Sequence, residues 1–172
     1  MTRNTLLLIG LIAFTAACSN TTTQPSQAAP NTFIFSATLL PSNEVPAITN
    51  AESVARGTAT ITFVVTRDSG SAITAATVTY SVAMTAFPAG SNITNAHIHE
   101  GNSSVSGPIR IQTTLSSGEV VFTGGAGSFT KSTASDAAFA QSVISTPDNF
   151  YFNVHSTLNP GGVMRGQLVR TN

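Results

Sequence analysis

Apolar and polar residues alternate with a period of two along most of the chain, which predicts a protein built from β-strands. The clearest case is residues 56–66, where alanine, isoleucine, phenylalanine and valine alternate mainly with threonine. Turn residues follow at 67–70, and residues 72–84 supply a return strand, so the two segments form a predicted hairpin. Further strands are expected at 32–40, 93–99, 109–114, 119–123, 150–156 and 163–170.

One segment, residues 132–144, has the pattern of a helix instead. Ser135 is its predicted cap, Asp136 suits its positive end, and Phe139 and Val143 fall on its buried side. Short strands separated by frequent turn signals predict an all-β fold. We therefore expect an antiparallel β-sandwich with one short helix.

The N-terminal residues have the composition of an export signal. Arg3 gives a positive start, residues 6–14 are mainly apolar, and small residues follow them. The apolar run is too short to span a bilayer. Residues 1–17 are therefore predicted to be a signal peptide of the lipoprotein type. Residues 18–31, rich in threonine, glutamine and proline, are predicted to be a flexible tether to a single domain at 32–172.

Cys18 is the only cysteine of the chain, so it has no internal disulfide partner. Its position after small residues resembles the lipobox of bacterial lipoproteins, in which the signal is cleaved before the cysteine and lipid is attached to it. The resemblance departs at Thr15, where leucine is usual, and a plain cleavable signal with secretion is the alternative. The expected location is the bacterial cell envelope, with the exported chain anchored to the membrane by lipid at Cys18.

Charged residues are scarce, at 8% of the chain, against about 25% in typical domains. Seven basic and seven acidic residues cancel, and no basic run occurs, so nucleic acid is not an expected partner. The scattered carboxylates do not suggest a paired-acid site, and the chain has neither a Gly-x-Ser-x-Gly elbow nor a phosphate-binding glycine loop. We expect no enzyme, with metal-dependent redox activity as the one open alternative.

All three histidines lie on two predicted strands. His97 and His99 are two residues apart and point to the same side, and His155 shares one face of its strand with Tyr151 and Asn153. Three imidazoles from two strands form a candidate site for copper or zinc, with water as a fourth ligand. The alternative is structural, with each ring bonded to backbone carbonyls or asparagines. Residue spacing does not give strand order, so whether the rings meet is left open.

Arg165 on the last predicted strand is the other notable polar residue. We expect it to form a structural pair with Glu44 of the first loop, joining the two ends of the sandwich. Ligand binding by Arg165 is the alternative.

Four ordered motifs resemble the CHRD domain, the repeated module of the secreted protein chordin that also occurs singly in bacterial exported proteins. The motifs are Leu39 to Pro46, Gly57 to Thr60, Ala96 to His99 with Gly101, Gly107 and Pro108, and Tyr151 to His155 with 159–162 and 165–168. The resemblance spans about residues 33–169 and departs mildly at Ala47, Glu100 and Met164. It implies an immunoglobulin-like β-sandwich or barrel outside the cell, and it implies no reaction.

Two functions are expected from these observations. The first is a lipid-anchored binding module of the cell envelope that recognises a protein or envelope component through loops at one end. The alternative is an envelope metal-binding protein that holds copper or zinc through His97, His99 and His155.

Overall fold

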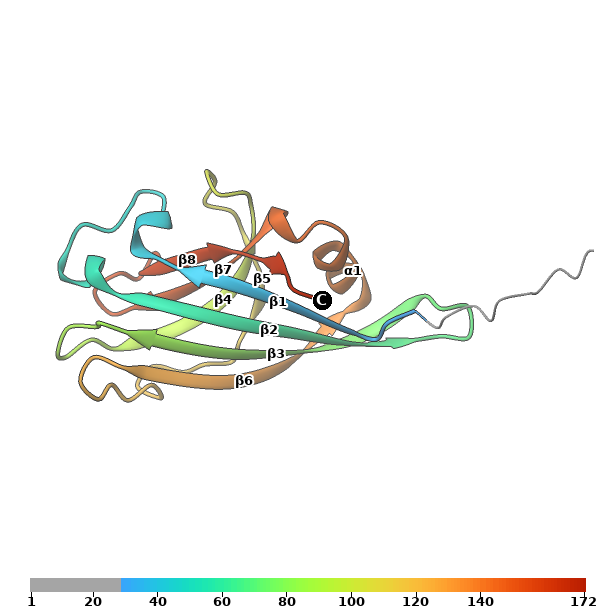
Figure 1. Ribbon diagram of the computed structural model, residues 1–172, viewed down its shortest axis with the longest axis horizontal. Coiled ribbons are helices and arrows are strands. Elements are labelled where there is room, and N and C mark those ends of the chain that lie inside the picture. Colours follow the sequence, from blue (N-terminus) through green and yellow to red (C-terminus); the bar gives the residue numbers. More distant parts are fainter. Residues whose placement is uncertain (1–28) are drawn as a thin grey trace, which may run out of the picture.

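Two antiparallel β-sheets pack face to face in the computed structural model, which describes residues 29–172 (Figure 1). The elements are β1 (Thr32–Leu39), η1 (Pro41–Asn43), η2 (Ala51–Val54), β2 (Arg56–Arg67), β3 (Ile73–Thr85), β4 (Ile93–Glu100), β5 (Ile109–Gln112), β6 (Gly127–Asp136), α1 (Ala137–Ser145), η3 (Pro147–Asn149), β7 (Phe150–Ser156), β8 (Met164–Gln167) and β9 (Val169–Arg170). The predicted signal peptide, Cys18 and most of the predicted tether lie outside the described residues.

One sheet has five strands in the order β6-β3-β2-β1-β9, and the other has four in the order β5-β4-β7-β8. Every strand pair is antiparallel. Figure 1 shows β1, β2, β3 and β6 in this order across one layer, with α1 at one end of the sandwich. The prediction of an all-β sandwich with one short helix is confirmed. Within the described residues, no helix is long and apolar enough to cross a membrane.

The core lies between the sheets, where the inward positions of each strand carry apolar side chains. In β2 the buried residues are every second one, as the alternation predicts. In β7 all seven residues are buried, because loops cover its outer face as well. The rings of Tyr80 on β3 and Phe152 on β7 stack with centroids 5.7 Å apart and so join the two sheets.

The outer face of the five-stranded sheet explains the low charge of the chain. Its outward positions are mostly threonine and serine, such as Thr58 and Thr60 on β2 and Ser132 on β6. Thr79 and Ser132 join β3 to β6 through a hydrogen bond of 2.8 Å between their hydroxyls. Uncharged hydroxyls therefore take many of the solvent-facing positions of this sheet.

The helix begins later than the sequence predicts. Residues 127–136 form β6, which pairs with β3 along its length, and α1 starts at Ala137. Asp136, not Ser135, is the cap, because its carboxylate accepts the Phe139 N–H at 2.8 Å. A ten-residue ladder outweighs the local helix preference of the segment. The predicted burial of Phe139 and Val143 is confirmed.

Two predicted strands also differ. Residues 119–123 form no named strand, and Val121 there is 76% exposed. The last predicted strand is divided into two strands in the structure. Of these, β8 pairs with β7 in one sheet, whereas β9 pairs with β1 in the other. The chain changes sheets at Leu168, whose side chain is buried in the core and whose N–H bonds the Phe150 carbonyl at 2.9 Å.

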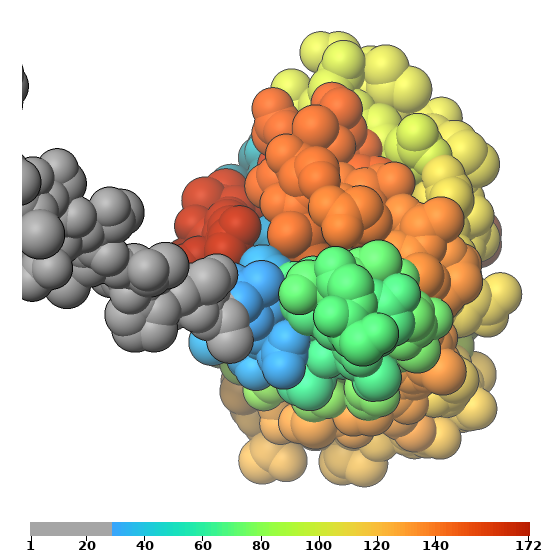
Figure 2. Space-filling model, turned by 90° about the vertical axis from the view of Figure 1, so that its right-hand side faces the viewer, coloured from blue at the N-terminus to red at the C-terminus, as the bar shows by residue number. Residues whose placement is uncertain are grey.

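The N-terminal end of the described chain is bonded to the β2–β3 hairpin. Arg67 donates to the Pro30 carbonyl at 3.0 Å and to the side-chain oxygen of Asn31 at 3.2 Å. Figure 2 views the molecule from this end, where the hairpin, the start of β1 and α1 lie together. The hairpin is thus bonded to residues 30 and 31, near the start of the described chain.

Candidate metal centre

The outer face of the four-stranded sheet carries the candidate site. Alternation along β4 and β7 turns Ile98 and Phe152 into the core and polar side chains to the outside. Loops cover this polar face, so most of its side chains are buried. The outward residues are Asn95, His97 and His99 on β4, Tyr151, Asn153 and His155 on β7, and Arg165 and Gln167 on β8.

The structure brings the three predicted histidines together. His155 lies opposite Asn95 and therefore diagonally next to His97. His97 Nδ1 and His155 Nε2 are 3.2 Å apart, and one ring nitrogen from each histidine lies within 4.8 Å of the other two. The exposed fractions of His97, His99 and His155 are 5%, 7% and 6%. The three imidazoles thus form one nearly closed cluster.

Backbone carbonyls orient two of the rings. His99 Nδ1 donates to the Gly107 carbonyl, and His155 Nδ1 donates to the Pro160 carbonyl, both at 2.9 Å. Each bond places the proton on Nδ1 and leaves a lone pair on Nε2. His155 Nε2 therefore accepts from His97 Nδ1, and His99 Nε2 is buried without a hydrogen-bond partner.

This geometry fits a metal ion. Zinc–nitrogen bonds of about 2.0–2.1 Å at tetrahedral angles place two ligand nitrogens about 3.4 Å apart, close to the 3.2 Å between His97 and His155. A cation there would take the place of the proton that the two nitrogens share. Metal-binding histidines typically donate their second ring N–H to a carbonyl or carboxylate, as His99 and His155 do.

Burial keeps the three rings neutral, which is the form that binds metal. The pKa of His97 is lowered from about 6.5 to about 4 by burial and by its two histidine neighbours. Burial also lowers the pKa of His99 and of His155, although the bonds to Gly107 and Pro160 act in the opposite direction. Protons therefore compete little with a metal at neutral pH.

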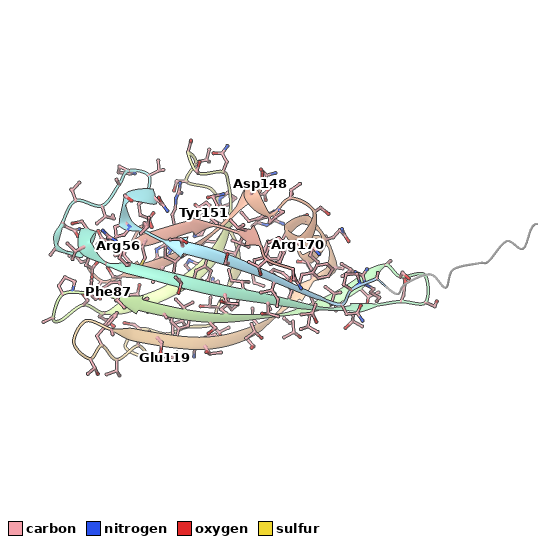
Figure 3. The ribbon with its side chains drawn as sticks, viewed as in Figure 1. Arg56, Phe87, Glu119, Asp148, Tyr151 and Arg170 are labelled. Carbon is pink, nitrogen blue, oxygen red and sulfur yellow. The ribbon has the colours of Figure 1, made fainter. Side chains whose placement is uncertain are left out.

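Tyr151 supports the cluster from the neighbouring position on β7, and its place in the fold is labelled in Figure 3. The His99 ring stacks on it with centroids 4.9 Å apart and an interplanar angle of 9°. The guanidinium carbon of Arg165 lies 4.3 Å from the centroid of the same ring. The Tyr151 hydroxyl accepts the Gly107 N–H at 3.0 Å. Tyr151 thus links His99 to the loop that carries its carbonyl partner.

Arg165 joins loops mainly through backbone groups. It is 1% exposed and donates to the carbonyls of Asn43, Ser103 and Val105 at 2.7, 2.7 and 2.9 Å. No Glu44 oxygen lies within 4.0 Å of its nitrogens in the described structure. Burial raises the pKa of Glu44 to about 7, and the charge of Arg165 acts in the opposite direction. Arg165 and Glu44 therefore interact at longer range than a direct ion pair.

Sequence reasoning missed Glu52, which is 2% exposed and lies in η2. Its carboxylate accepts hydrogen bonds from Ser156 and Asn159, beside the loop that orients His155. A single glutamate in a loop has no signal in its local sequence that marks it as buried, because its partners lie more than a hundred residues away.

The lowered histidine pKa values predict a pH-dependent stability of the metal-free protein. Unfolded histidines take up protons below about pH 6.5, whereas folded His97 does so only near pH 4, so acid favours the unfolded state. Glu44 acts oppositely over this range, and we therefore compare wild type with His97→Asn. The stability advantage of wild type should shrink by about 2 kcal/mol between pH 7 and pH 5 in urea titrations with chelator present. An unchanged difference would contradict the lowered pKa.

Comparison with known families adds an independent finding. A sequence model of the CHRD domain matches residues 35–168, a range that includes all three histidines. Searches of curated proteins and of solved structures found no match. A CHRD domain suggests a binding or interaction module. The resemblance seen in the motifs is thereby confirmed, and the chain belongs to the CHRD domain family.

Proposed function

We propose that this CHRD domain is a metal-binding module that holds one copper or zinc ion through His97, His99 and His155. The observation that carries the proposal is the cluster itself, in which three buried imidazoles offer ring nitrogens within 4.8 Å of one another. Carbonyl bonds leave the Nε2 atoms of His99 and His155 free to bind a metal.

Buried polar atoms without hydrogen-bond partners around the cluster support the proposal that a cation binds there. Five buried side-chain atoms lack a hydrogen-bond partner in the described structure, and four of them lie on or above this sheet face. Buried polar groups are normally satisfied, and an ion or ordered water is a common reason for an exception. The four atoms are all acceptors: Glu44 Oε1, Asn95 Oδ1, His99 Nε2 and Asn153 Oδ1.

The ligand atoms that the cluster offers restrict which metal ions it can bind. The cluster offers three nitrogen ligands, and no carboxylate or thiolate of the described residues joins it. Calcium and magnesium require oxygen ligands, whereas imidazoles suit zinc and copper. Three protein ligands leave one position for water or for a group from a partner.

The test is metal content and affinity of the purified protein. After chelator treatment and exposure to copper or zinc, wild type should hold one metal per chain by mass spectrometry and calorimetry. The variant with His97, His99 and His155 all replaced by alanine should hold none while keeping its β-type circular dichroism spectrum. Gln112→Ala is the matched control, because this exposed residue lies opposite His97 on β5. Equal binding by the triple variant, or no binding by wild type, would refute the proposal.

A second candidate function is recognition of a protein or envelope partner by loops. At the end of the sandwich away from the β2–β3 turn at residues 68–72, where Figure 3 labels Phe87, lies a hollow of about 650 Å³. Phe87, Phe122 and Val54 line it, and Val54 is 56% exposed. This function predicts that pull-down of a partner survives the triple histidine replacement and fails with Val54→Asp.

We also place the module in the bacterial cell envelope, with residues 1–17 as a signal peptide and Cys18 as the lipid attachment site. The composition of these residues supports this location. Labelling with a radioactive fatty acid in a bacterial host tests it, since Cys18→Ala should remove the label and release the protein from the membrane fraction. A label retained by Cys18→Ala would refute the lipid anchor.

A further inference from the structure

We infer that Glu52 is a positioning residue, which holds the loop between β7 and β8 so that the Pro160 carbonyl fixes His155 in the tautomer that binds metal. The expected effect of Glu52 on metal affinity rests on the proposed metal site. The structural part of the inference, the tautomer of His155, is measurable in the metal-free protein.

The carboxylate of Glu52 receives its donors from the end of β7 and the loop that follows. Its Oε2 atom accepts from the Ser156 hydroxyl and, at 2.6 Å, from the Asn159 side-chain amide. A buried carboxylate is unfavourable unless donors reach it. No basic side chain of the described residues forms an ion pair with Glu52. The hydrogen bonds of its carboxylate therefore all come from residues 156–159, at the end of β7 and the start of this loop.

Asn50 strengthens the same attachment. Its side-chain oxygen accepts the Glu52 N–H at 3.0 Å and so caps η2, which fixes the start of the segment that carries the carboxylate. Its side-chain nitrogen donates to Asn159 Oδ1 at 2.8 Å. Both polar atoms of the Asn159 side chain are thus held by the segment 50–52.

A tight turn in the loop couples the position of Asn159 to the position of the Pro160 carbonyl, which contacts His155. The Asn159 carbonyl accepts hydrogen bonds from the Ser156 N–H at 3.2 Å and from the Gly162 N–H at 3.1 Å. These two bonds tie the backbone before Pro160 to the backbone after it and form a closed turn. The Pro160 carbonyl then accepts His155 Nδ1 at 2.9 Å. Because the turn is a closed unit, a displacement of Asn159 moves the Pro160 carbonyl away from the ring.

The Pro160 carbonyl matters for His155 because it determines which ring nitrogen carries the proton. With its proton on Nδ1, His155 presents the Nε2 lone pair toward His97, 3.2 Å away. Without the carbonyl, the proton is free to move to Nε2, which then no longer accepts from His97 or binds a metal. Outer-shell partners of metal-binding histidines typically change affinity about 10- to 100-fold when they are lost.

The experiment compares Glu52→Ala with Glu52→Gln. Two-bond proton–nitrogen NMR correlations of the metal-free protein report the protonated ring nitrogen of each histidine. Wild type should show His155 as the Nδ1–H tautomer, and Glu52→Ala should show a mixture together with a zinc affinity about 10- to 100-fold weaker. Glu52→Gln keeps an acceptor oxygen in place and should restore both readouts to near wild type.

Other results would overturn the inference. A Glu52→Ala variant that melts at a lower temperature but keeps the His155 tautomer and zinc affinity would make Glu52 a structural residue only. If Glu52→Ala does not fold, Asn50→Ala should shift the tautomer in the same direction, and an unchanged tautomer would overturn the inference. Glu119→Ala, at an exposed acid paired with Lys131, is the control and should change neither readout. Absence of both zinc and copper binding by wild type would refute the metal proposal alone, since the tautomer measurement still decides the role of Glu52.

Discussion

Replacing Arg165 with methionine should lower the free energy of unfolding by about 3–5 kcal/mol. Methionine keeps much of the side-chain length and the packing on Tyr151, but it has no N–H donor. The carbonyls of Asn43, Ser103 and Val105 would then lose a charged partner in a buried setting. Urea unfolding followed by circular dichroism measures the loss, because the chain has no tryptophan for fluorescence.

Arg170→Met is the matched control for this prediction. Arg170 also lies over an aromatic ring, with its guanidinium carbon 4.9 Å from the Phe33 centroid, but it is exposed. Its side chain donates a hydrogen bond to the nearby Asn172 carbonyl at the surface, so its loss should cost less than about 1 kcal/mol. Equal losses at the two positions would show that the loop carbonyls do not depend on Arg165.

Replacing Gly107 with alanine should destabilise the protein by about 3 kcal/mol and weaken metal binding at the same time. A Cβ at this position would lie 1.6 Å from the Glu100 carbonyl oxygen, so the backbone has to move. The same residue supplies the carbonyl for His99 and the N–H for the Tyr151 hydroxyl. Urea unfolding and zinc calorimetry on one preparation measure the two losses.

Gly161→Ala provides the comparison, because a Cβ there would meet nothing within 4 Å. It lies in the loop that orients His155, so it tests the second loop of the site with the same chemical change. We expect a stability change within about 0.5 kcal/mol and unchanged zinc affinity. A Gly107→Ala variant as stable as Gly161→Ala would contradict the close approach of Gly107 to Glu100.

The strands that carry the site are predictable because alternation is a local property. The shared side of His97 and His99, and the opposite sides of Phe152 and His155, follow from the period of two. The meeting of His97 with His155 does not follow, because it depends on β7 pairing with β4 after four intervening elements. Local sequence specifies the face of each residue, and long-range pairing specifies its neighbours.

The wrong helix boundary, the missed residue Glu52 and the unpredicted carbonyl partners of Arg165 have the same origin. Residues 132–136 prefer a helix locally, but the ladder with β3 holds them in β6. Glu52 and Arg165 owe their roles to partners that lie far away in the chain, and backbone carbonyls as partners leave no trace in the sequence. The signal peptide, the tether and lipid attachment at Cys18 stay predictions, since residues 1–28 lie outside the described structure.

The position of β7 between β4 and β8 also determines when the site can form. A chain that has folded only as far as β6 offers a metal the His97 and His99 pair, and the third ligand arrives with one of the last strands. Such long-range pairing is slow, with folding times of milliseconds to seconds in comparable β-proteins. For the proposed metal site, loading is therefore expected late, on an already assembled sandwich, where a bound ion would oppose unfolding by mass action.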